Sequence, residues 1–171
     1  YLQYFINEAR RLGLKVTVST AMFPSGHPAT NEGLVYEESR WDGKTCLEYT
    51  PDGKMLDIRE DKKKVGAFLN PVRKDVRKFA LSIVREIVKN YDVDAYALDY
   101  CRYPGDDSDF SADSHKAFEH YLGKKVRNFP DNIFTWNADG TKNPGVYYKE
   151  WWAFRANVIT SFVKEVRKEI H

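Results

Sequence analysis

The chain has 171 residues, of which 42% are hydrophobic and 30% are charged. This length and balance are typical of one globular domain with a core of its own, and they are short for two domains. No apolar run approaches the ~20 residues that a membrane-spanning helix needs, so we expect no membrane span. Lys and Arg exceed Asp and Glu by only two, 27 against 25, and the signs are interleaved along the chain. The charge therefore gives no indication of a nucleic-acid partner.

The chain opens with a predicted helix and a predicted strand. Apolar residues recur at helical spacing from Leu2 to Leu12, and Gly13 stands where a helix C-cap is expected. Residues 14–20 alternate and are rich in β-branched side chains, which predicts a strand. A long irregular insertion over about 21–65 follows. Within it, Pro51-Asp52-Gly53 supplies the turn of a predicted hairpin over 46–58.

A second helix and strand come next. Asn70 precedes Pro71, an arrangement that predicts a helix N-cap followed by proline at the first helical position. An apolar stripe with helical spacing then continues to Asn90. Residues 95–100 form the next predicted strand.

The remaining chain contains a second insertion, over about 104–147, and a last helix over 148–170. Ser111 and Gly123 are the expected ends of a helix over about 112–122 inside this insertion. The helix-to-strand links are short, whereas both insertions follow strands. In parallel α/β folds the segments that leave the carboxyl ends of strands build the active face, so we expect the functional site there.

Asp99, at the end of the second predicted strand, is the first candidate for a functional carboxylate. Strand alternation places Ala95, Ala97 and Asp99 on one face. Small residues followed by a carboxylate suit a crowded barrel interior that ends in a site. Arg102 is close enough to pair with Asp99 or to hold a substrate hydroxyl or carboxylate. The alternative is a purely structural ion pair between the two residues.

We expect neither a metal nor a cofactor. Asp107, Asp109, Ser111 and Asp113 alternate as in a calcium loop, but the glycine and the bidentate glutamate that such a loop requires are replaced by Ala112 and Phe118. Phosphate-loop, dinucleotide and Ser/His/Asp nucleophile motifs are missing from the sequence.

Several runs of sequence together resemble the family-10-like glycoside hydrolases, bacterial proteins with a TIM barrel. The runs are Phe68-Leu69-Asn70-Pro71, Tyr91-Asp92-Val93-Asp94, Leu98-Asp99-Tyr100-Cys101-Arg102-Tyr103-Pro104, Asp109-Phe110-Ser111, Tyr121-Leu122-Gly123, and Trp152, Phe154, Arg155 and Asn157 in the last helix. The resemblance covers most of residues 1–171. It implies an α/β fold that is a partial TIM (β/α)8 barrel, with about two β/α units and long loop insertions, within a single domain. We expect the rest of the barrel to lie outside this chain.

The resemblance also implies an activity, the hydrolysis of a polysaccharide or a peptidoglycan-type glycan. Glycosidases need two carboxyl groups, and we expect Asp99 to be the nucleophile or base. The general acid is expected on a later strand. Substrate contacts are expected from a group of polar and aromatic residues in the loops: Arg102, Tyr100, Tyr103, Asn70, Trp41 and Trp136. For each aromatic residue, ordinary packing under a long loop is the alternative.

The partner implied is an oligosaccharide or polysaccharide, and the location implied is periplasmic, cell-surface or extracellular. A non-catalytic carbohydrate-binding module and a structural domain of a cell-surface protein, both with the same fold, remain the alternatives to an enzyme.

Overall fold

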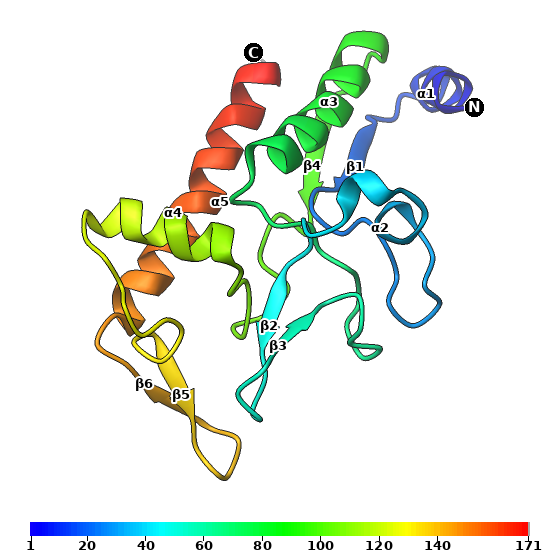
Figure 1. The fold of residues 1–171 in the computed structure, drawn as a ribbon. Helices are drawn as coiled ribbons and strands as arrows, with labels where there is room; N and C mark the ends of the chain where they lie inside the picture. Colours follow the sequence, from blue (N-terminus) through cyan, green and yellow to red (C-terminus); the bar gives the residue numbers. More distant parts are fainter. Residues whose placement is uncertain (171) are drawn as a thin grey trace.

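In the computed structural model, which describes residues 1–170, the chain forms a mixed α/β fold around one pair of parallel strands (Figure 1). Strands β1 (Thr17–Ala21) and β4 (Ala95–Asp99) pair in register, with Thr17 opposite Ala95 and Ala21 opposite Asp99. Parallel strands require a crossover connection. Helix α3 (Lys74–Asn90) lies in that connection, so the expected α/β order is confirmed.

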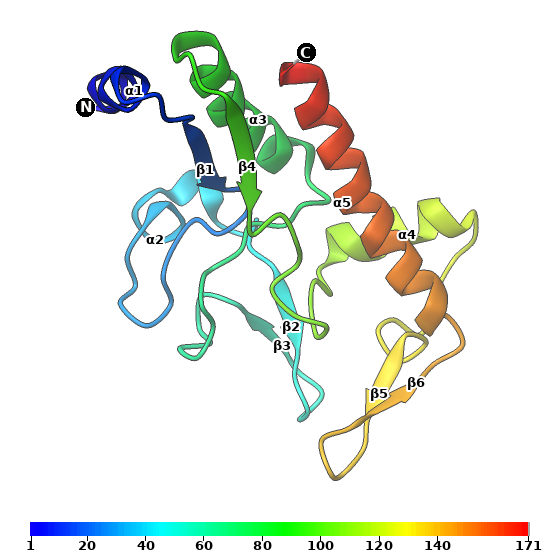
Figure 2. The same ribbon diagram turned by 180° about the vertical axis from the view of Figure 1, so that it is seen from behind.

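Two long helices cover one face of this strand pair. Helices α3 and α5 (Tyr148–Ile170) lie side by side (Figure 2). Val76, Ala80 and Val84 of α3 are buried in the same core cluster as Phe162 and Val166 of α5, and the cluster also takes up the half-buried side chains of Tyr96 and Leu98. The apolar stripe read from the sequence is therefore the face that α3 buries.

The other face of the strand pair is open. Every second residue is exposed, and the exposed set contains only small side chains and one carboxylate: Thr17, Ser19, Ala21, Ala95, Ala97 and Asp99. The predicted alternation in β4 is confirmed. Parallel strands are ordinarily covered on both faces, and the described residues cover only one face of this pair.

The two insertions fold against the carboxyl ends of the strands (Figures 1 and 2). The first contains α2 (Leu34–Glu37), the short 3-10 helix η1 (Ser39–Trp41) and the expected hairpin of β2 (Leu47–Tyr49) and β3 (Met55–Asp57). The second contains α4 (Ala112–Leu122) and a hairpin of β5 (Phe134–Trp136) and β6 (Lys142–Pro144).

The ends of α4 confirm the sequence prediction. Ser111 is its N-cap and accepts a hydrogen bond from the Ser114 N–H at 3.3 Å. Gly123 ends it with a left-handed φ of 70°, a conformation that glycine adopts without steric penalty. The hairpin of β5 and β6 was not predicted, because its strands have three residues each and the sequence shows only the turn signals around them.

The start of α3 differs from the prediction. The helix begins at Lys74 with Arg73 as its N-cap, not at Pro71 with Asn70 as its N-cap. The Asn70 side chain has other partners: its amide nitrogen donates to Asp109 at 2.6 Å, and its amide oxygen accepts from the Val72 N–H at 3.0 Å. A buried tertiary hydrogen bond thus replaces the local cap.

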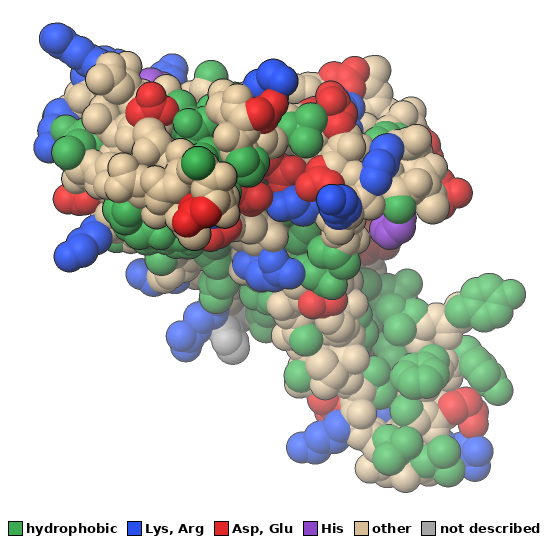
Figure 3. Space-filling view, turned by 90° about the horizontal axis from the view of Figure 1, so that it is seen from below, with side chains coloured by type: hydrophobic (Ala, Val, Ile, Leu, Met, Phe, Trp, Pro, Cys, Tyr) green, Lys and Arg blue, Asp and Glu red, His purple; other side chains and the backbone are tan. Residues whose placement is uncertain are grey.

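Eleven of the 25 aromatic residues are buried in the core, and most of the others pack against it. A second cluster, between the insertions and α5, centres on Trp151, whose ring stacks on Phe110 at 5.1 Å and meets Phe118 edge-on at 4.9 Å. Exposed apolar side chains are instead frequent in and near α1 (Leu2–Arg11), where Tyr4 and Phe5 face outward. In Figure 3 they form the green patch in the more distant, fainter part of the molecule. None of the described helices is long and apolar enough to span a membrane.

Candidate functional site

Asp99 ends β4 with its side chain exposed on the open face of the strand pair. Its carbonyl oxygen accepts from the Met22 N–H at 2.9 Å, so the strand pair continues to its last residue. One carboxylate oxygen accepts from the Tyr100 N–H at 2.9 Å. The strand pairing and this short hydrogen bond fix the carboxylate at the carboxyl end of the strand, where the sequence predicted a site.

Tyr100 turns the chain away directly after Asp99. Its φ is 46°, in the left-handed region that a residue other than glycine enters at a cost of roughly 1–2 kcal/mol. The strand therefore stops at Asp99 and does not include Tyr100 as predicted. The Tyr100 ring packs edge-on against Phe68 at 5.9 Å, and this contact offsets part of the cost. Strained residues of this kind are common next to functional groups.

Arg102 does not pair with Asp99, so the alternative of a purely structural ion pair between the two residues is not found in the structure. The exposed guanidinium lies over the Tyr100 ring at 5.1 Å and donates to the carbonyl oxygens of Tyr103 at 3.1 Å and Pro104 at 3.4 Å. Within residues 1–170 it forms no ion pair with a carboxylate. The side chains of Asp99 and Arg102 are thus both exposed and free of an ion pair with each other.

Three of the expected substrate-binding residues are buried in this structure. Trp41 is 3% exposed and packs on Phe79 of α3 at 4.8 Å. Tyr103 is 6% exposed beneath Arg155, and Asn70 is 1% exposed beside Asp109. In this structure none of the three presents an open face to a sugar.

The other two aromatic candidates are half-buried. Trp136 donates its indole N–H to the Tyr49 carbonyl at 3.0 Å, and the Lys142 ammonium lies 4.9 Å from its ring. Tyr100 stays beside Asp99. Tyr100 and Arg102 thus follow Asp99 directly in the loop after β4. Trp136 lies elsewhere, in β5 of the second insertion's hairpin.

Glu48 is a buried acid that the sequence did not single out. It is 2% exposed and one oxygen lies 2.5 Å from the Lys64 ammonium, which also contacts Asp107 at 3.2 Å. Burial raises the pKa of Glu48 to about 6, and the hydrogen bond and charge of Lys64 counteract part of that rise. Its carboxyl group is enclosed by this ion pair.

Asp109 joins the two insertions to the start of α3. Its fully buried carboxylate accepts from the Leu47 N–H at 2.6 Å, the Asn70 amide at 2.6 Å and the hydroxyls of Ser111 at 2.5 Å and Ser114 at 2.6 Å. Burial raises its pKa, although these hydrogen bonds oppose the shift. With its acceptor oxygens occupied by four protein donors, Asp109 is a structural residue.

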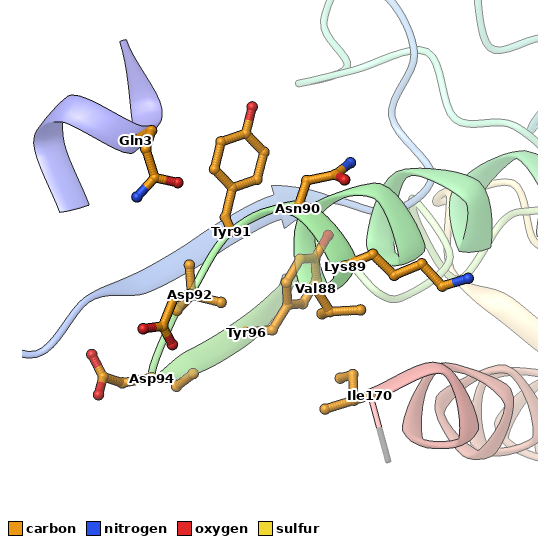
Figure 4. Close-up of a pocket in the computed structure, with 11 residues that line it drawn as sticks. Gln3, Val88, Lys89, Asn90, Tyr91, Asp92, Asp94, Tyr96 and Ile170 are labelled. Carbon is orange, nitrogen blue, oxygen red and sulfur yellow. The ribbon is translucent and has the colours of Figure 1, made fainter. Parts of the chain in front are cut away.

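Two surface hollows bracket the strand pair. One, of about 510 Å³, lies between α1, the link from α3 to β4 and the end of α5, and Figure 4 shows Asp92, Asp94 and Tyr96 along it. It is at the amino end of β4, opposite Asp99. In parallel α/β folds that end serves stability, whereas the carboxyl end carries chemistry. We therefore do not assign the site to the hollow in Figure 4.

The second hollow follows Asp99. It has a volume of about 440 Å³ and lies between residues 101–106 and the first half of α5. Two of its lining residues, Trp152 and Arg155, were not among the site residues expected from the sequence. The signal for Trp152 was present: adjacent Trp151 and Trp152 cannot share one helix face, and Trp151 is 1% exposed whereas Trp152 is 37% exposed. Arg155 donates to the Gly105 carbonyl and so ties α5 to the loop that follows β4. Among the described residues no group of His, Cys, Asp and Glu is arranged to hold a metal ion.

Comparison with known proteins places this geometry in a family context. The family model described as "Glycosyl hydrolase-like 10" matches residues 1–171. A relative described as "S-layer-related protein", from Niallia circulans, is 37% identical over 172 residues, a match that covers 98% of this chain. The chain spans 10% of the length of that relative.

Proposed function

We propose that this chain, which belongs to the glycosyl hydrolase-like 10 family, supplies a catalytic carboxylate, Asp99, to a glycoside hydrolase site. The observation that carries the proposal is the exposed position of Asp99 at the carboxyl end of a parallel strand. Loops at that end of the strands build the active sites of parallel α/β enzymes. The substrate class is a polysaccharide or a peptidoglycan-type glycan.

The open face of the strand pair supports a barrel as the setting. Ser19, Ala21 and Ala97 leave room for side chains from neighbouring strands, and α3 and α5 already cover the opposite face. The interior of a (β/α)8 barrel is filled by layers of side chains from all its strands. We propose that β1 and β4 are neighbouring strands of such a barrel, whose further β/α units cover the open face.

Hydrolysis in this setting requires a second carboxyl group. The pair stands roughly 5–5.5 Å apart in retaining enzymes and 6.5–9.5 Å apart in inverting ones. Asp99 serves as nucleophile or base. Glu48 and Asp109 are buried and occupied by Lys64 and by hydrogen-bond donors, respectively. We therefore propose that a later strand of the barrel supplies the general acid.

A second function is favoured by the S-layer-related relative. The same fold can hold a glycan without cutting it, as a binding or structural domain at a cell surface. A cell-surface location fits both functions, because both a surface glycan and a surface-layer protein are found there. The two functions differ only in turnover.

The test is the release of reducing ends from bacterial cell-wall glycans and plant polysaccharides by the purified protein that contains this chain together with the rest of the proposed barrel. Asp99→Asn is compared with Asp92→Asn, which changes another exposed aspartate before β4, at the opposite end of the strand. The enzyme proposal expects release by the parent protein and by Asp92→Asn, and a loss of 10³-fold or more in Asp99→Asn, on the order of removing a catalytic group. Full turnover in Asp99→Asn would overturn the role of Asp99. Glycan binding without turnover in all three proteins would favour the binding function.

A further inference from the structure

The hollow that follows Asp99 is built from two parts of the chain that meet at the carboxyl end of β4. Residues 101–106 form one wall, and Trp152, Arg155 and Ile159 of α5 form the other. Its volume of about 440 Å³ suits a single sugar ring and its substituents. The hollow begins two residues after the proposed catalytic carboxylate.

The hollow carries two guanidinium groups that have no carboxylate partner among residues 1–170. Arg102 is exposed and donates only to backbone carbonyl oxygens. Arg155 is 4% exposed; its Nη2 donates to the Gly105 carbonyl, while Nε and Nη1 have no partner within the described residues. The acid that lines the hollow, Asp106, is already paired with Lys142 at 2.5 Å. The hollow therefore has a surplus of positive charge.

An aromatic ring lies beside these charges. The Arg155 guanidinium is held between the rings of Tyr103, at 4.5 Å, and Trp152, at 4.6 Å. Trp152 remains 37% exposed, and its ring meets Tyr148 edge-on at 6.0 Å. An exposed indole next to a fixed cation offers an apolar surface for the C–H face of a ring and an attraction for a charge on that ring.

We propose that this hollow binds a carboxylate-bearing sugar ring, with Trp152 contacting the ring and Arg102 holding the carboxylate in the field of Arg155. A guanidinium matches the planar carboxylate with two parallel hydrogen bonds. This assignment deepens the proposed function, and it rests on that proposal only where it makes the ring part of the glycan substrate. Arg155 acts as a positioning residue, because its unpaired nitrogens have almost no exposed surface.

Isothermal titration calorimetry tests the assignment on a catalytically disabled background, the Asp99→Asn protein. The probes are oligogalacturonate, hyaluronan oligosaccharides and peptidoglycan glycan strands that keep their lactyl carboxylates, each paired with its carboxyl-reduced counterpart. We expect at least one acidic probe to bind about tenfold or more tightly than its reduced counterpart, as one charge-assisted contact provides. High salt should narrow that difference.

Variants locate the site. Arg102→Gln should abolish the preference for the acidic probe, and Trp152→Ala should weaken both members of the pair. Arg127→Gln is the matched control, because Arg127 is also an exposed arginine but lies in the second insertion, beyond α4. Both affected side chains are partly exposed, and thermal melting by circular dichroism checks that each variant folds.

Three outcomes overturn the assignment. They are no binding of any acidic probe, equal binding of acidic and reduced probes, and an acid preference that survives Arg102→Gln. Binding is measured without turnover, so a failed assignment is distinct from a failed glycosidase proposal. An inactive parent protein with intact acid preference contradicts only the latter, and active protein without acid preference contradicts only the former.

Discussion

The buried carboxylate of Asp109 gives the most quantitative prediction of how the insertions are held over the strand ends. In Asp109→Ala four donors lose their acceptor: the Leu47 N–H, the Asn70 amide and the hydroxyls of Ser111 and Ser114. A buried donor left unpaired costs roughly 1–3 kcal/mol. The hydroxyls can rotate toward other acceptors, whereas the Leu47 N–H and the Asn70 amide are fixed. We therefore expect a loss of about 3–5 kcal/mol in the free energy of unfolding.

Urea denaturation followed by circular dichroism measures this loss. The control is Asp113→Ala, because Asp113 is exposed and its ion pair with Arg73 is a surface pair worth roughly 0–1 kcal/mol. If Asp109→Ala does not fold, Asp109→Asn keeps the shape and one acceptor oxygen, and its loss should lie between those of the two alanine variants. Equal stability of Asp109→Ala and Asp113→Ala would refute the structural role given to Asp109.

Two further predictions concern the buried side chains of Glu48 and Trp41 in the first insertion, and the second compares Trp41 with the partly exposed Trp152 of α5. Burial raises the pKa of Glu48 from its ordinary 4.5 to about 6, so the folded protein holds that proton more tightly than the unfolded chain does. The contribution of this pKa shift to the free energy of unfolding is then fully present below about pH 4.5 and is lost as the pH rises through about 6. Relative to Glu48→Gln, the parent protein should lose at most about 2 kcal/mol of unfolding free energy between pH 4 and pH 7, and a difference that does not change with pH would contradict the shift. Trp41→Ala, at a buried ring, should cost roughly 3–5 kcal/mol, whereas Trp152→Ala, at a partly exposed ring, should cost about 1 kcal/mol or less; equal losses in thermal or urea unfolding would show that the burial assigned to Trp41 is incorrect.

The helices and strands follow from local signals in the sequence. The apolar stripe of α3, the Ser111 cap and Gly123 end of α4, and the alternation of β4 each depend on residues close in sequence, and each appears in the structure where the pattern indicates. The same alternation placed Asp99 at the end of the predicted strand, on the face that also carries Ala95 and Ala97. Local propensity and hydrophobic period are sufficient for such features.

The contacts of the insertions could not be predicted in the same way. Asn70 has the local pattern of an N-cap, yet its side-chain amide donates a hydrogen bond to Asp109, 39 residues later. Trp41 lies in a segment whose sequence predicts a loop, yet its ring packs against Phe79 of α3. Arg102 stands three residues after Asp99, but the left-handed turn at Tyr100 directs the chain away from an ion pair. Each outcome depends on which distant residue occupies the neighbouring space, and that information is not local.

The most direct test of the central claim is the rate at which the protein that contains this chain and the rest of the proposed barrel releases reducing ends from a glycan, measured side by side for the parent, Asp99→Asn and Asp92→Asn. The exposed strand-end position of Asp99 predicts that the parent and Asp92→Asn have the same kcat/KM and that Asp99→Asn, although folded, loses turnover. Unchanged turnover in folded Asp99→Asn would contradict the claim.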